Sequence, residues 1–347
     1  PPRRLQWTAG PLWARSHGYT PSVSAMVSAA GRLFYICDET LTGAGPYAVS
    51  KWRLVARDAF SGLLLWKIPV PVWGSAQFSG TPDIGGGAGS VGRFTMPPNV
   101  GKRLVAVGDR VFVTLGPRAP ITSLNAATGK TLEIYEETAR ADEILCTDGK
   151  LIVSINPQVK ITPPEKTKSA APTPAPGKHV CAIDLKTGKT AWRKGPFAPI
   201  RTTKGQDPLG RLELAAGDGR VVLLTRKTIE ALDIESGKNL WRIDRPALAA
   251  SAVKRVGYSA MYEYGLTVMV YRSGVVLLAQ PEPDFHHTYH TTPGTLYAFD
   301  ADSGKQMWKN PYGGWGHHTQ HDVFVVGDDV WTHVHTIATK FGSTGAG

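Results

Sequence analysis

A nine-residue motif of the form D-x-x-[ST]-G-K-x-x-W recurs along this chain of 347 residues and constrains its fold more than any other feature. The clearest copies are residues 58–66, 184–192, 233–241 and 300–308. A fifth copy at 125–133 has lost its tryptophan, and a degraded sixth lies at 340–345. The glycines of successive copies are 67, 59, 49, 67 and 41 residues apart, which fits a structural repeat with loop insertions of variable length.

Each position of the motif has a structural role in a β-hairpin. Asp or Asn starts a turn because its side-chain oxygen accepts hydrogen bonds from backbone amides two residues on. Gly supplies the positive φ that closes the hairpin with the right twist. The tryptophan returns on the next strand, where we expect its flat ring to wedge between adjacent sheets.

A second hairpin precedes each copy of the motif. Apolar strands flank short turns at 30–31, 108–109, 148–149, 218–219, 273–274 and 327–328. Two successive hairpins make one four-stranded antiparallel sheet, and such sheets repeated around an axis form a β-propeller. The sequence therefore predicts an all-β fold, a β-propeller of four-stranded antiparallel blades.

The hairpin count favours six blades. The sequence given stops where a final tryptophan strand should follow, and Leu5-Gln6-Trp7 resembles that missing strand. We expect residues 1–347 to form a single β-propeller domain whose N-terminal strand closes the last blade and removes exposed sheet edges. The alternative is a fragment of a seven- or eight-bladed ring. Residues 157–178 are predicted to be a Pro-rich mobile insert, because they cannot bury a core.

Charge and cysteine content exclude several function classes. The chain has 39 Lys and Arg against 28 Asp and Glu, a net charge of +11, but the basic residues are scattered singly and form no stripe. This pattern argues against specific nucleic-acid binding and suits a surface that faces anionic lipid or polysaccharide. Cys37, Cys146 and Cys181 form no CxxC pair, which excludes a zinc ribbon. No apolar run reaches the ~20 residues of a transmembrane segment, and no signal peptide is visible.

The repeat resembles that of the PQQ-like, quinoprotein alcohol dehydrogenase-type β-propeller family, which also includes an outer-membrane assembly scaffold. In the dehydrogenases of that family a quinone lies on the axis, held by adjacent cysteines, a tryptophan and calcium. No two cysteines are adjacent in this chain, which argues against bound PQQ. The resemblance implies a periplasmic or secreted protein. No spacing singles out a calcium site among the candidate carboxylates, which are Asp83, Glu143, Asp207, Glu263 and Asp284.

Histidines are concentrated near the end of the chain. Two segments share the pattern HHxxH, at 286–290 and 317–321, and we expect both to leave the same face of the ring because two strands separate them. Imidazole is a common ligand of zinc, copper and iron, so these segments predict a transition-metal site. A structural or surface role for the histidines is the alternative. The candidate ligands are His286, His287, His290, His317, His318, His321, His333 and His335.

Three function classes remain. The first is a non-catalytic propeller that acts as an extracytoplasmic interaction scaffold, with a protein partner or a cell-envelope polysaccharide as ligand. The second is a metal-dependent or redox enzyme that uses the histidine-rich face. The third is a carbohydrate-binding or sensor module of a larger secreted protein, with Trp73, Trp315 and Tyr312 as stacking platforms. The first is favoured because no nucleophile elbow, paired acidic motif or cofactor fingerprint is visible.

Overall fold

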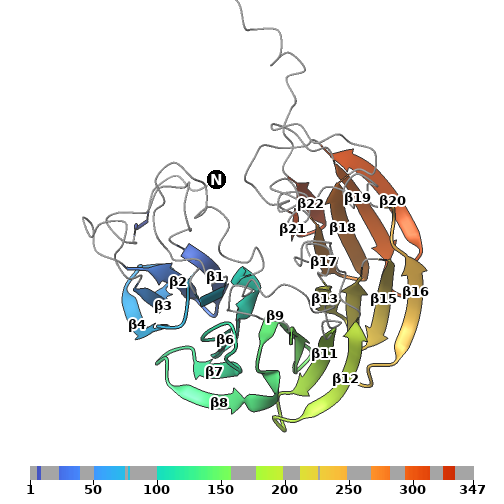
Figure 1. Ribbon diagram of the computed structural model, residues 1–347. Helices are drawn as coiled ribbons and strands as arrows, with labels where there is room; N and C mark the ends of the chain where they lie inside the picture. Colours follow the sequence, from blue (N-terminus) through green and yellow to red (C-terminus); the bar gives the residue numbers. More distant parts are fainter. Residues whose placement is uncertain are drawn as a thin grey trace, which may run out of the picture. The chain divides into compact units, whose positions relative to one another are not determined.

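The computed structural model describes residues 6–8, 23–39, 51–74, 77–78, 100–157, 177–197, 212–225, 227–247, 267–281, 294–312 and 323–332 (Figure 1). The chain divides into two compact units. One consists of Pro1–Thr190 with Lys194–Pro196, and the other of Ala191–Arg193 with Phe197–Gly347.

The described residues form five four-stranded antiparallel sheets and one two-stranded hairpin. Blade 1 comprises β1 (Val23–Ala29), β2 (Arg32–Asp38), β3 (Trp52–Asp58) and β4 (Leu64–Pro69). Blade 2 comprises β5 (Leu104–Val107), β6 (Arg110–Thr114), β7 (Ile121–Asn125) and β8 (Thr131–Tyr135). Blade 3 comprises β9 (Ala141–Thr147), β10 (Lys150–Ile155), β11 (Lys178–Asp184) and β12 (Thr190–Phe197).

The remaining strands follow the same plan. Blade 4 comprises β13 (Glu213–Gly217), β14 (Arg220–Leu224), β15 (Thr228–Asp233) and β16 (Asn239–Asp244). Blade 5 comprises β17 (Val268–Arg272), β18 (Val275–Pro281), β19 (Gly294–Asp300) and β20 (Gln306–Tyr312). The hairpin of β21 (Val323–Val326) and β22 (Asp329–Thr332) follows, and two short 3-10 helices lie at Val100–Arg103 and Glu136–Thr138.

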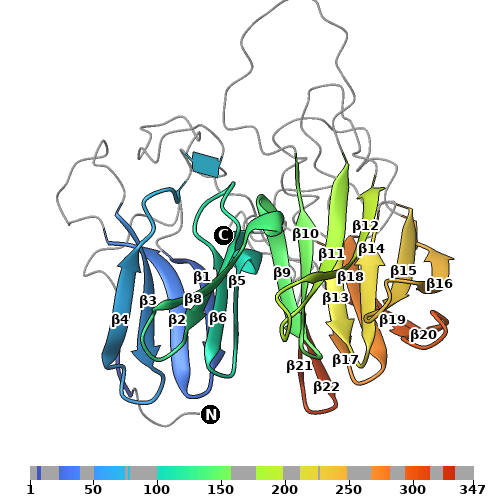
Figure 2. The same ribbon diagram turned by 90° about the horizontal axis from the view of Figure 1, so that it is seen from below.

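Every four-stranded sheet is a simple antiparallel meander, as the repeat predicts. All six predicted first hairpins are present, each closed by a two-residue turn. Four turns have positive φ at both residues, for example Asp148 at 50° and Gly149 at 70°, and the turns at 108–109 and 327–328 have it at the glycine. The first hairpin and the motif turn lie at the same end of a blade, which we call its turn end. In Figure 2 these short connections lie at one end of the strands of each blade. We call the opposite end the loop end, because the long connections between the strands leave from it.

The motif turn has the predicted hydrogen bonds in every described copy. In blade 4, Asp233 Oδ1 accepts bonds from the Ser236 amide at 2.7 Å and the Ser236 hydroxyl at 2.6 Å. The Gly237 amide then donates to the Asp233 carbonyl at 2.8 Å, with φ of 67° at the glycine. These bonds favour the ionised carboxylate and hold the pKa of Asp233 below its usual range. Three equivalent aspartates have lowered pKa values for the same reason, namely Asp58, Asp184 and Asp300.

This shared feature predicts acid-sensitive stability. A pKa lowered in the folded state gives stability that is present above the unfolded-state pKa, about 3.9, and is lost as the pH falls through the folded-state value. Replacing the four aspartates with Asn, which blade 2 already carries at Asn125, removes this contribution and should lower the free energy of unfolding at pH 7 while making it less dependent on pH. The measurement is urea unfolding followed by circular dichroism at about pH 7 and about pH 3. The reverse change Asn125→Asp should raise the free energy of unfolding at pH 7 more than at pH 3, and an unchanged pH dependence in both variants would contradict the prediction.

The motif tryptophans join each blade to the turn of the next blade, as predicted. Trp66 donates from Nε1 to the Ala126 carbonyl at 2.9 Å, and its ring covers Gly129 so closely that a Cβ there would lie 2.7 Å from it. Trp192 and Trp241 make the same pair of contacts with the turns that follow them, at 2.8 Å to Ile234 and Ala301. Glycine is therefore required at the turn both for its positive φ and to admit the indole.

The copy without tryptophan uses a different contact. Glu133 replaces the indole, and its Oε1 occupies the place where a Cβ on Gly188 would lie. A carboxylate cannot donate to a turn carbonyl, so the indole hydrogen bond is missing between blades 2 and 3.

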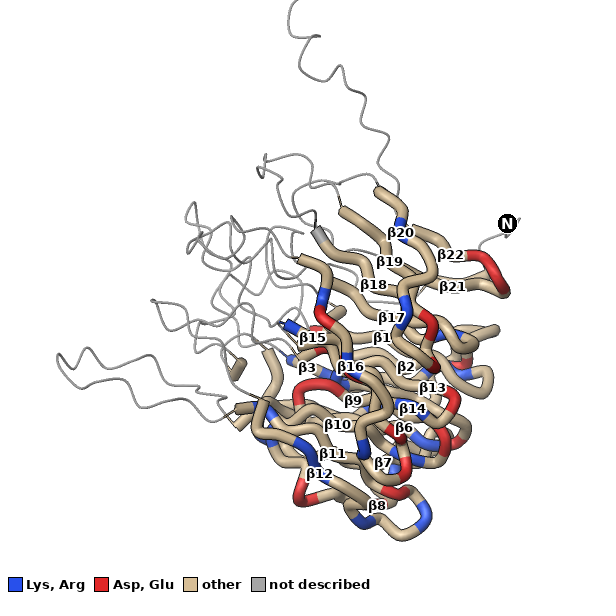
Figure 3. Tube along the Cα trace, turned by 90° about the vertical axis from the view of Figure 1, so that its right-hand side faces the viewer, with Lys and Arg blue, Asp and Glu red and all other residues tan. Residues whose placement is uncertain are grey.

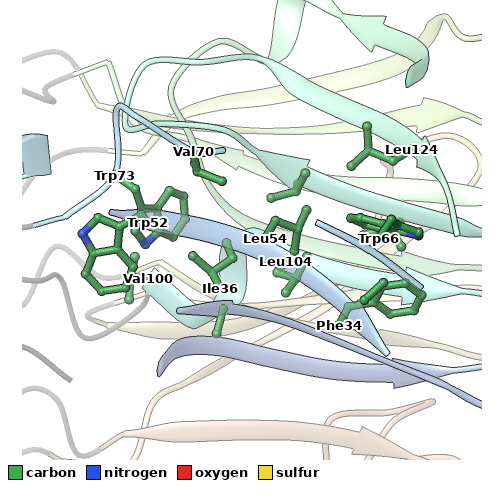
Figure 4. Close-up of a cluster of buried hydrophobic side chains, with 14 of the residues drawn as sticks. Phe34, Ile36, Trp52, Leu54, Trp66, Val70, Trp73, Val100, Leu104 and Leu124 are labelled. Atoms are coloured by element: carbon green, nitrogen blue, oxygen red, sulfur yellow. The ribbon is translucent and has the colours of Figure 1, made fainter. Parts of the chain in front are cut away.

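The core lies between successive blades. Figure 4 shows the cluster shared by blades 1 and 2, in which Phe34 and Trp66 lie with ring centroids 5.9 Å apart. A second cluster joins Phe112, Ile121 and Tyr135 of blade 2 to blade 3. All three cysteines lie on strands with free thiols, and Cys37 and Cys181 are buried. Burial raises the pKa of Cys37 and of Cys146 to about 11, so these thiols stay protonated.

Some predicted features lie outside the described residues. They include residues 158–176 of the Pro-rich insert and residues 336–345, beside which the N-terminal strand was expected to pair. The last residue of the predicted insert, Lys178, is the first residue of β11 and forms an ion pair with Asp142 at 2.8 Å. Trp7, from the predicted closing strand, donates to the Ala59 carbonyl at 3.1 Å and covers Gly62. It thus makes with blade 1 the contacts that Trp66 makes with blade 2.

Candidate functional site at the loop end of the blades

The loop end of blade 5 brings three strand termini together. Pro281 at the end of β18 pairs with Gly294 at the start of β19, and Gly294 pairs with Tyr312 at the end of β20. Residues 282–293 connect Pro281 to Gly294, and residues 313–322 connect Tyr312 to β21; each segment contains one HHxxH pattern. The chain positions that enter both histidine segments are therefore neighbours at one end of one sheet.

The last hairpin has a similar arrangement at its open end. Val323 pairs with Thr332, and the side chains of Val323, Val325 and Val330 pack against blade 5. His321 precedes Val323 by two residues, and His333 directly follows Thr332. The register thus brings two more histidine-bearing stretches of the sequence to a common strand end.

The predicted ligands themselves fall outside the described residues. This applies to all eight candidate histidines and to Trp315, while Tyr312 is described as the last residue of β20. In the part of the chain that the structure describes, no group of three or more His, Cys, Asp or Glu side chains is arranged to hold a metal ion. The metal site therefore stays a prediction.

Trp73, predicted as an exposed platform for a sugar, is a core residue. Only 2% of its surface is exposed, its Nε1 donates to Ser24 Oγ at 2.9 Å, and its ring meets Phe78 edge-on at 5.0 Å. No apolar periodicity surrounds Trp73 in the sequence, so its burial was not predictable from the pattern. Trp73 cannot stack on a ligand, and this part of the carbohydrate-binding hypothesis is wrong.

A polar network fixes the loop ends of blades 4 and 5. Arg245 directly follows β16 and donates to the Thr225 carbonyl, Thr267 Oγ1 and Gln280 Oε1 at 3.1, 3.2 and 3.1 Å. Gln280 is fully buried and in turn donates to the Pro246 carbonyl at 3.1 Å. Burial lowers the pKa of Arg245 to about 10, so the guanidinium remains charged at neutral pH. The network ties together the strand ends from which residues 248–266 and 282–293 leave.

A second network lies at the loop ends of blades 2 and 3. Arg103 is 2% exposed, donates to the Ala141 carbonyl and lies 5.1 Å from the Phe78 ring centroid. Beside it, the buried Asp142 pairs with Lys178, and Lys178 together with Arg103 offsets the cost of burial and lowers the pKa of that carboxyl. Burial lowers the pKa of Arg103 itself to about 10. These charges connect the strand ends of blades 2 and 3.

One of the carboxylates considered as a calcium ligand, Glu143, forms an ion pair with a lysine of the protein. Glu143 is buried, and its Oε1 accepts a hydrogen bond from Lys102 Nζ at 2.7 Å. The other four candidates lie outside the described residues. Sequence reasoning also missed Arg103 and Arg245, because single basic residues beside strands carry no motif.

Among the described residues, Figure 3 shows Lys and Arg interspersed with Asp and Glu over strand ends and turns, without a continuous basic stripe. No helix in the described part of the chain is long and apolar enough to cross a membrane.

Comparison with known proteins agrees with the repeat. The family model described as outer membrane protein assembly factor BamB matches residues 173–282, which contain two copies of the motif. No curated protein sequence matches the chain.

Solved structures give distant similarities. A quinohemoprotein alcohol dehydrogenase from Pseudomonas putida is 14% identical, with a TM-score of 0.35 over 66% of this chain. The match spans 37% of that enzyme's length. Saccharomyces cerevisiae Sqt1 is 9% identical with a TM-score of 0.45, and the match covers 90% of this chain and 69% of Sqt1. The Neurospora crassa Pan2 WD40 domain is 10% identical with a TM-score of 0.43, over 84% of this chain and 65% of the domain. Similarities this distant carry no argument about function.

The repeat has one consistent three-dimensional form. Five described copies of the motif turn have one hydrogen-bond pattern, and three motif tryptophans lock blade to blade in one way. Together with the family match over residues 173–282, these features support a propeller built from PQQ-like repeats.

Proposed function

We propose that this chain is an extracytoplasmic interaction scaffold that binds a partner protein or an envelope polysaccharide through the loop end of its blades. The observation that carries the proposal is the contrast between the two ends. The turn ends repeat one short hydrogen-bonded turn, whereas the loop ends are joined by chain segments that differ in length and composition. Buried networks around Arg103 and Arg245 hold the strand ends from which these segments leave. A rigid framework with variable connections is a common basis of recognition.

Site-specific photo-cross-linking in the native cells tests this proposal. Asp244 at the loop end of β16 and Lys238 at its turn end are both exposed and only six residues apart, so they form a matched pair. A photoreactive residue at 244 should give a defined cross-linked product in the periplasmic or secreted fraction, and one at 238 should not. Products that form only from 238, or a protein confined to the cytoplasm, would contradict the proposal.

The histidine segments support a second candidate, a transition-metal site at the loop end of blade 5. The support comes from the register that brings Pro281, Gly294 and Tyr312 to one strand end. Imidazoles from the two flanking segments, with those from 333 and 335, provide enough nitrogen ligands for zinc, copper or iron. Such a site serves either a metal-dependent or redox enzyme or a scaffold whose loop end is ordered by metal.

Replacing His287 and His318 with Ala should reduce the retained metal by at least about tenfold. The measurement is elemental analysis of the purified protein, and circular dichroism should show an unchanged fold because neither residue lies in a described strand. His179→Gln on β11 is the matched control and should retain the metal. A purified protein without bound metal, or equal retention in all three proteins, would leave the histidines with a surface role.

We further propose that the N-terminal segment closes the repeat as a strand of the last blade. The support is Trp7, which binds the blade 1 turn at Ala59 and Gly62 as the motif tryptophans bind theirs. Deleting residues 1–10 should lower the melting temperature and increase aggregation, because it removes this tryptophan and exposes a sheet edge. Unchanged melting would contradict the closure.

A further inference from the structure

The outer turn of blade 1 exposes a contiguous group of large apolar side chains, which we call the blade 1 tip. It consists of Phe60, Leu63, Leu64 and Leu65, whose exposed fractions are 77%, 69%, 47% and 42%. Scattered apolar residues are ordinary on a protein surface, but four within six residues of one turn form a patch that water solvates poorly. The fold does not need them there, since the turn is closed by Asp58 and Gly62.

The other repeats provide an internal control for this patch. At the position of Leu63 the four other copies carry Lys130, Lys189, Lys238 and Lys305, all of them exposed. At the position of Phe60 they carry Ala127, Lys186, Glu235 and Asp302. All five turns have the same hydrogen bonds, so the backbone does not dictate the residue type. Blade 1 has therefore replaced a charged turn with an apolar one on an unchanged framework.

The neighbouring hairpin of blade 1 shows the same loss of polarity. Its turn residue Ala30 is exposed and has φ of 46°, a conformation that alanine adopts at a cost. The equivalent positions in blades 3, 4 and 5 have the same positive φ but carry Asp148, Asp218 and Ser273. The Ala59 amide bonds the Gly31 carbonyl at 2.8 Å, so the two turns lie together. The turn end of blade 1 is thus apolar across both of its hairpins.

Cations follow this apolar tip on the next turns of the same unit. The blade 2 turn carries Lys130, and the blade 3 turn carries Lys186 and Lys189. Several acidic groups at this end have protein partners, since Asp58 accepts bonds from its own turn, Asp109 pairs with Arg32 at 3.3 Å and Asp184 pairs with Lys150 at 3.2 Å. The chain as a whole carries a net charge of +11. An apolar tip beside exposed lysines is complementary to a lipid surface, in which anionic headgroups cover apolar acyl chains.

We propose that the blade 1 tip is a membrane-insertion site through which the protein binds the interface of an anionic lipid bilayer. Phe60, Leu63 and Leu64 enter the boundary between headgroups and acyl chains, where their transfer from water is favourable. Lys130, Lys186 and Lys189 remain at the headgroup level and contact lipid phosphates. The loop end, at the opposite end of the strands, stays available to other ligands.

Vesicle flotation with the full chain tests the proposal. The probes are phosphatidylcholine vesicles with and without phosphatidylglycerol, and the variant is Phe60→Glu/Leu63→Lys, which gives blade 1 the residues that blade 4 has at Glu235 and Lys238. This double change preserves net charge. We expect the original protein to bind the anionic vesicles, and the variant to lose at least about tenfold in partitioning with an unchanged melting temperature. The reciprocal variant Glu235→Phe/Lys238→Leu should gain binding at equal net charge.

Three outcomes would overturn the proposal. They are absence of vesicle binding by the original protein, equal binding by the double variant, and equal binding to neutral and anionic vesicles. Size-exclusion chromatography of the same samples separates insertion from pairing between two copies. The original protein could form a dimer that vesicles do not dissociate, while the double variant is monomeric. That result would assign the tip to self-association instead of membrane binding.

Discussion

Replacing Trp192 with Ala is expected to lower the free energy of unfolding by about 3–5 kcal/mol, the range for truncating a large buried aromatic residue. The indole is 9% exposed and donates to the Ile234 carbonyl at 2.8 Å. Its ring also covers Gly237, where a Cβ would lie 2.7 Å from it. Removal therefore leaves a cavity against the blade 4 turn and an unpaired carbonyl. Urea unfolding followed by circular dichroism measures the change.

The control for this prediction is Trp331→Ala. Trp331 lies on β22 and is 55% exposed, so its truncation should cost less than about 1 kcal/mol. Trp192→Phe should give an intermediate loss, because a phenyl ring fills part of the space but cannot donate a hydrogen bond. Equal losses for Trp192→Ala and Trp331→Ala would show that the motif tryptophans do not lock the blades together.

Replacing Arg103 with Ala is expected to destabilise the fold by about 3–5 kcal/mol, the usual cost of removing one partner from a buried charge pair. Arg103 is 2% exposed, and its charge, with that of Lys178, offsets the buried charge of Asp142. Its guanidinium also donates to the Ala141 carbonyl and stacks on Phe78. The substitution leaves the carbonyl unpaired and the carboxylate with a single cation. Chemical unfolding at neutral pH measures the effect.

A partly buried arginine of the same unit, whose partner carboxylate is exposed, provides the comparison. Arg32 pairs with Asp109 at 3.3 Å, and the carboxylate side chain is 81% exposed, so solvent screens the interaction. Arg32→Ala should cost less than about 1 kcal/mol. In Arg103→Ala, the second change Asp142→Asn should recover part of the lost stability, because it removes the charge that Arg103 compensated. Failure of this recovery would show that Arg103 acts through packing alone.

The exposed tip of blade 1 shows how a repeat helps to identify function. A single exposed phenylalanine carries little information, but the five copies of the turn share one backbone geometry and differ in side chain. The comparison of Leu63 with the four lysines at its position therefore separates what the turn requires from what it does not. The same reasoning identifies Glu133 as a substitution within the framework, because it contacts Gly188 as the motif tryptophans contact the glycines of their turns.

The sequence by itself determined the fold and the way the blades join. The Asp and the Gly of the motif form contacts within their own turn. The Trp contacts the equivalent turn of the next repeat. Their pattern therefore predicted the hairpins, the positive φ at Gly237 and the wedge at Trp192. Period-two apolar strands predicted which residues form the core, and these signals are local.

Only the tertiary structure decided which isolated residues are buried and what they contact. Trp73 and Trp331 look alike in the sequence, yet one is 2% and the other 55% exposed. Arg103 and Arg245 bind groups on other strands up to 38 residues away, and no local pattern encodes such contacts. The pairing of Pro281 with Gly294 and of Gly294 with Tyr312 likewise depends on strand register. Burial and register are properties of the packed chain, because each depends on residues that are distant in sequence.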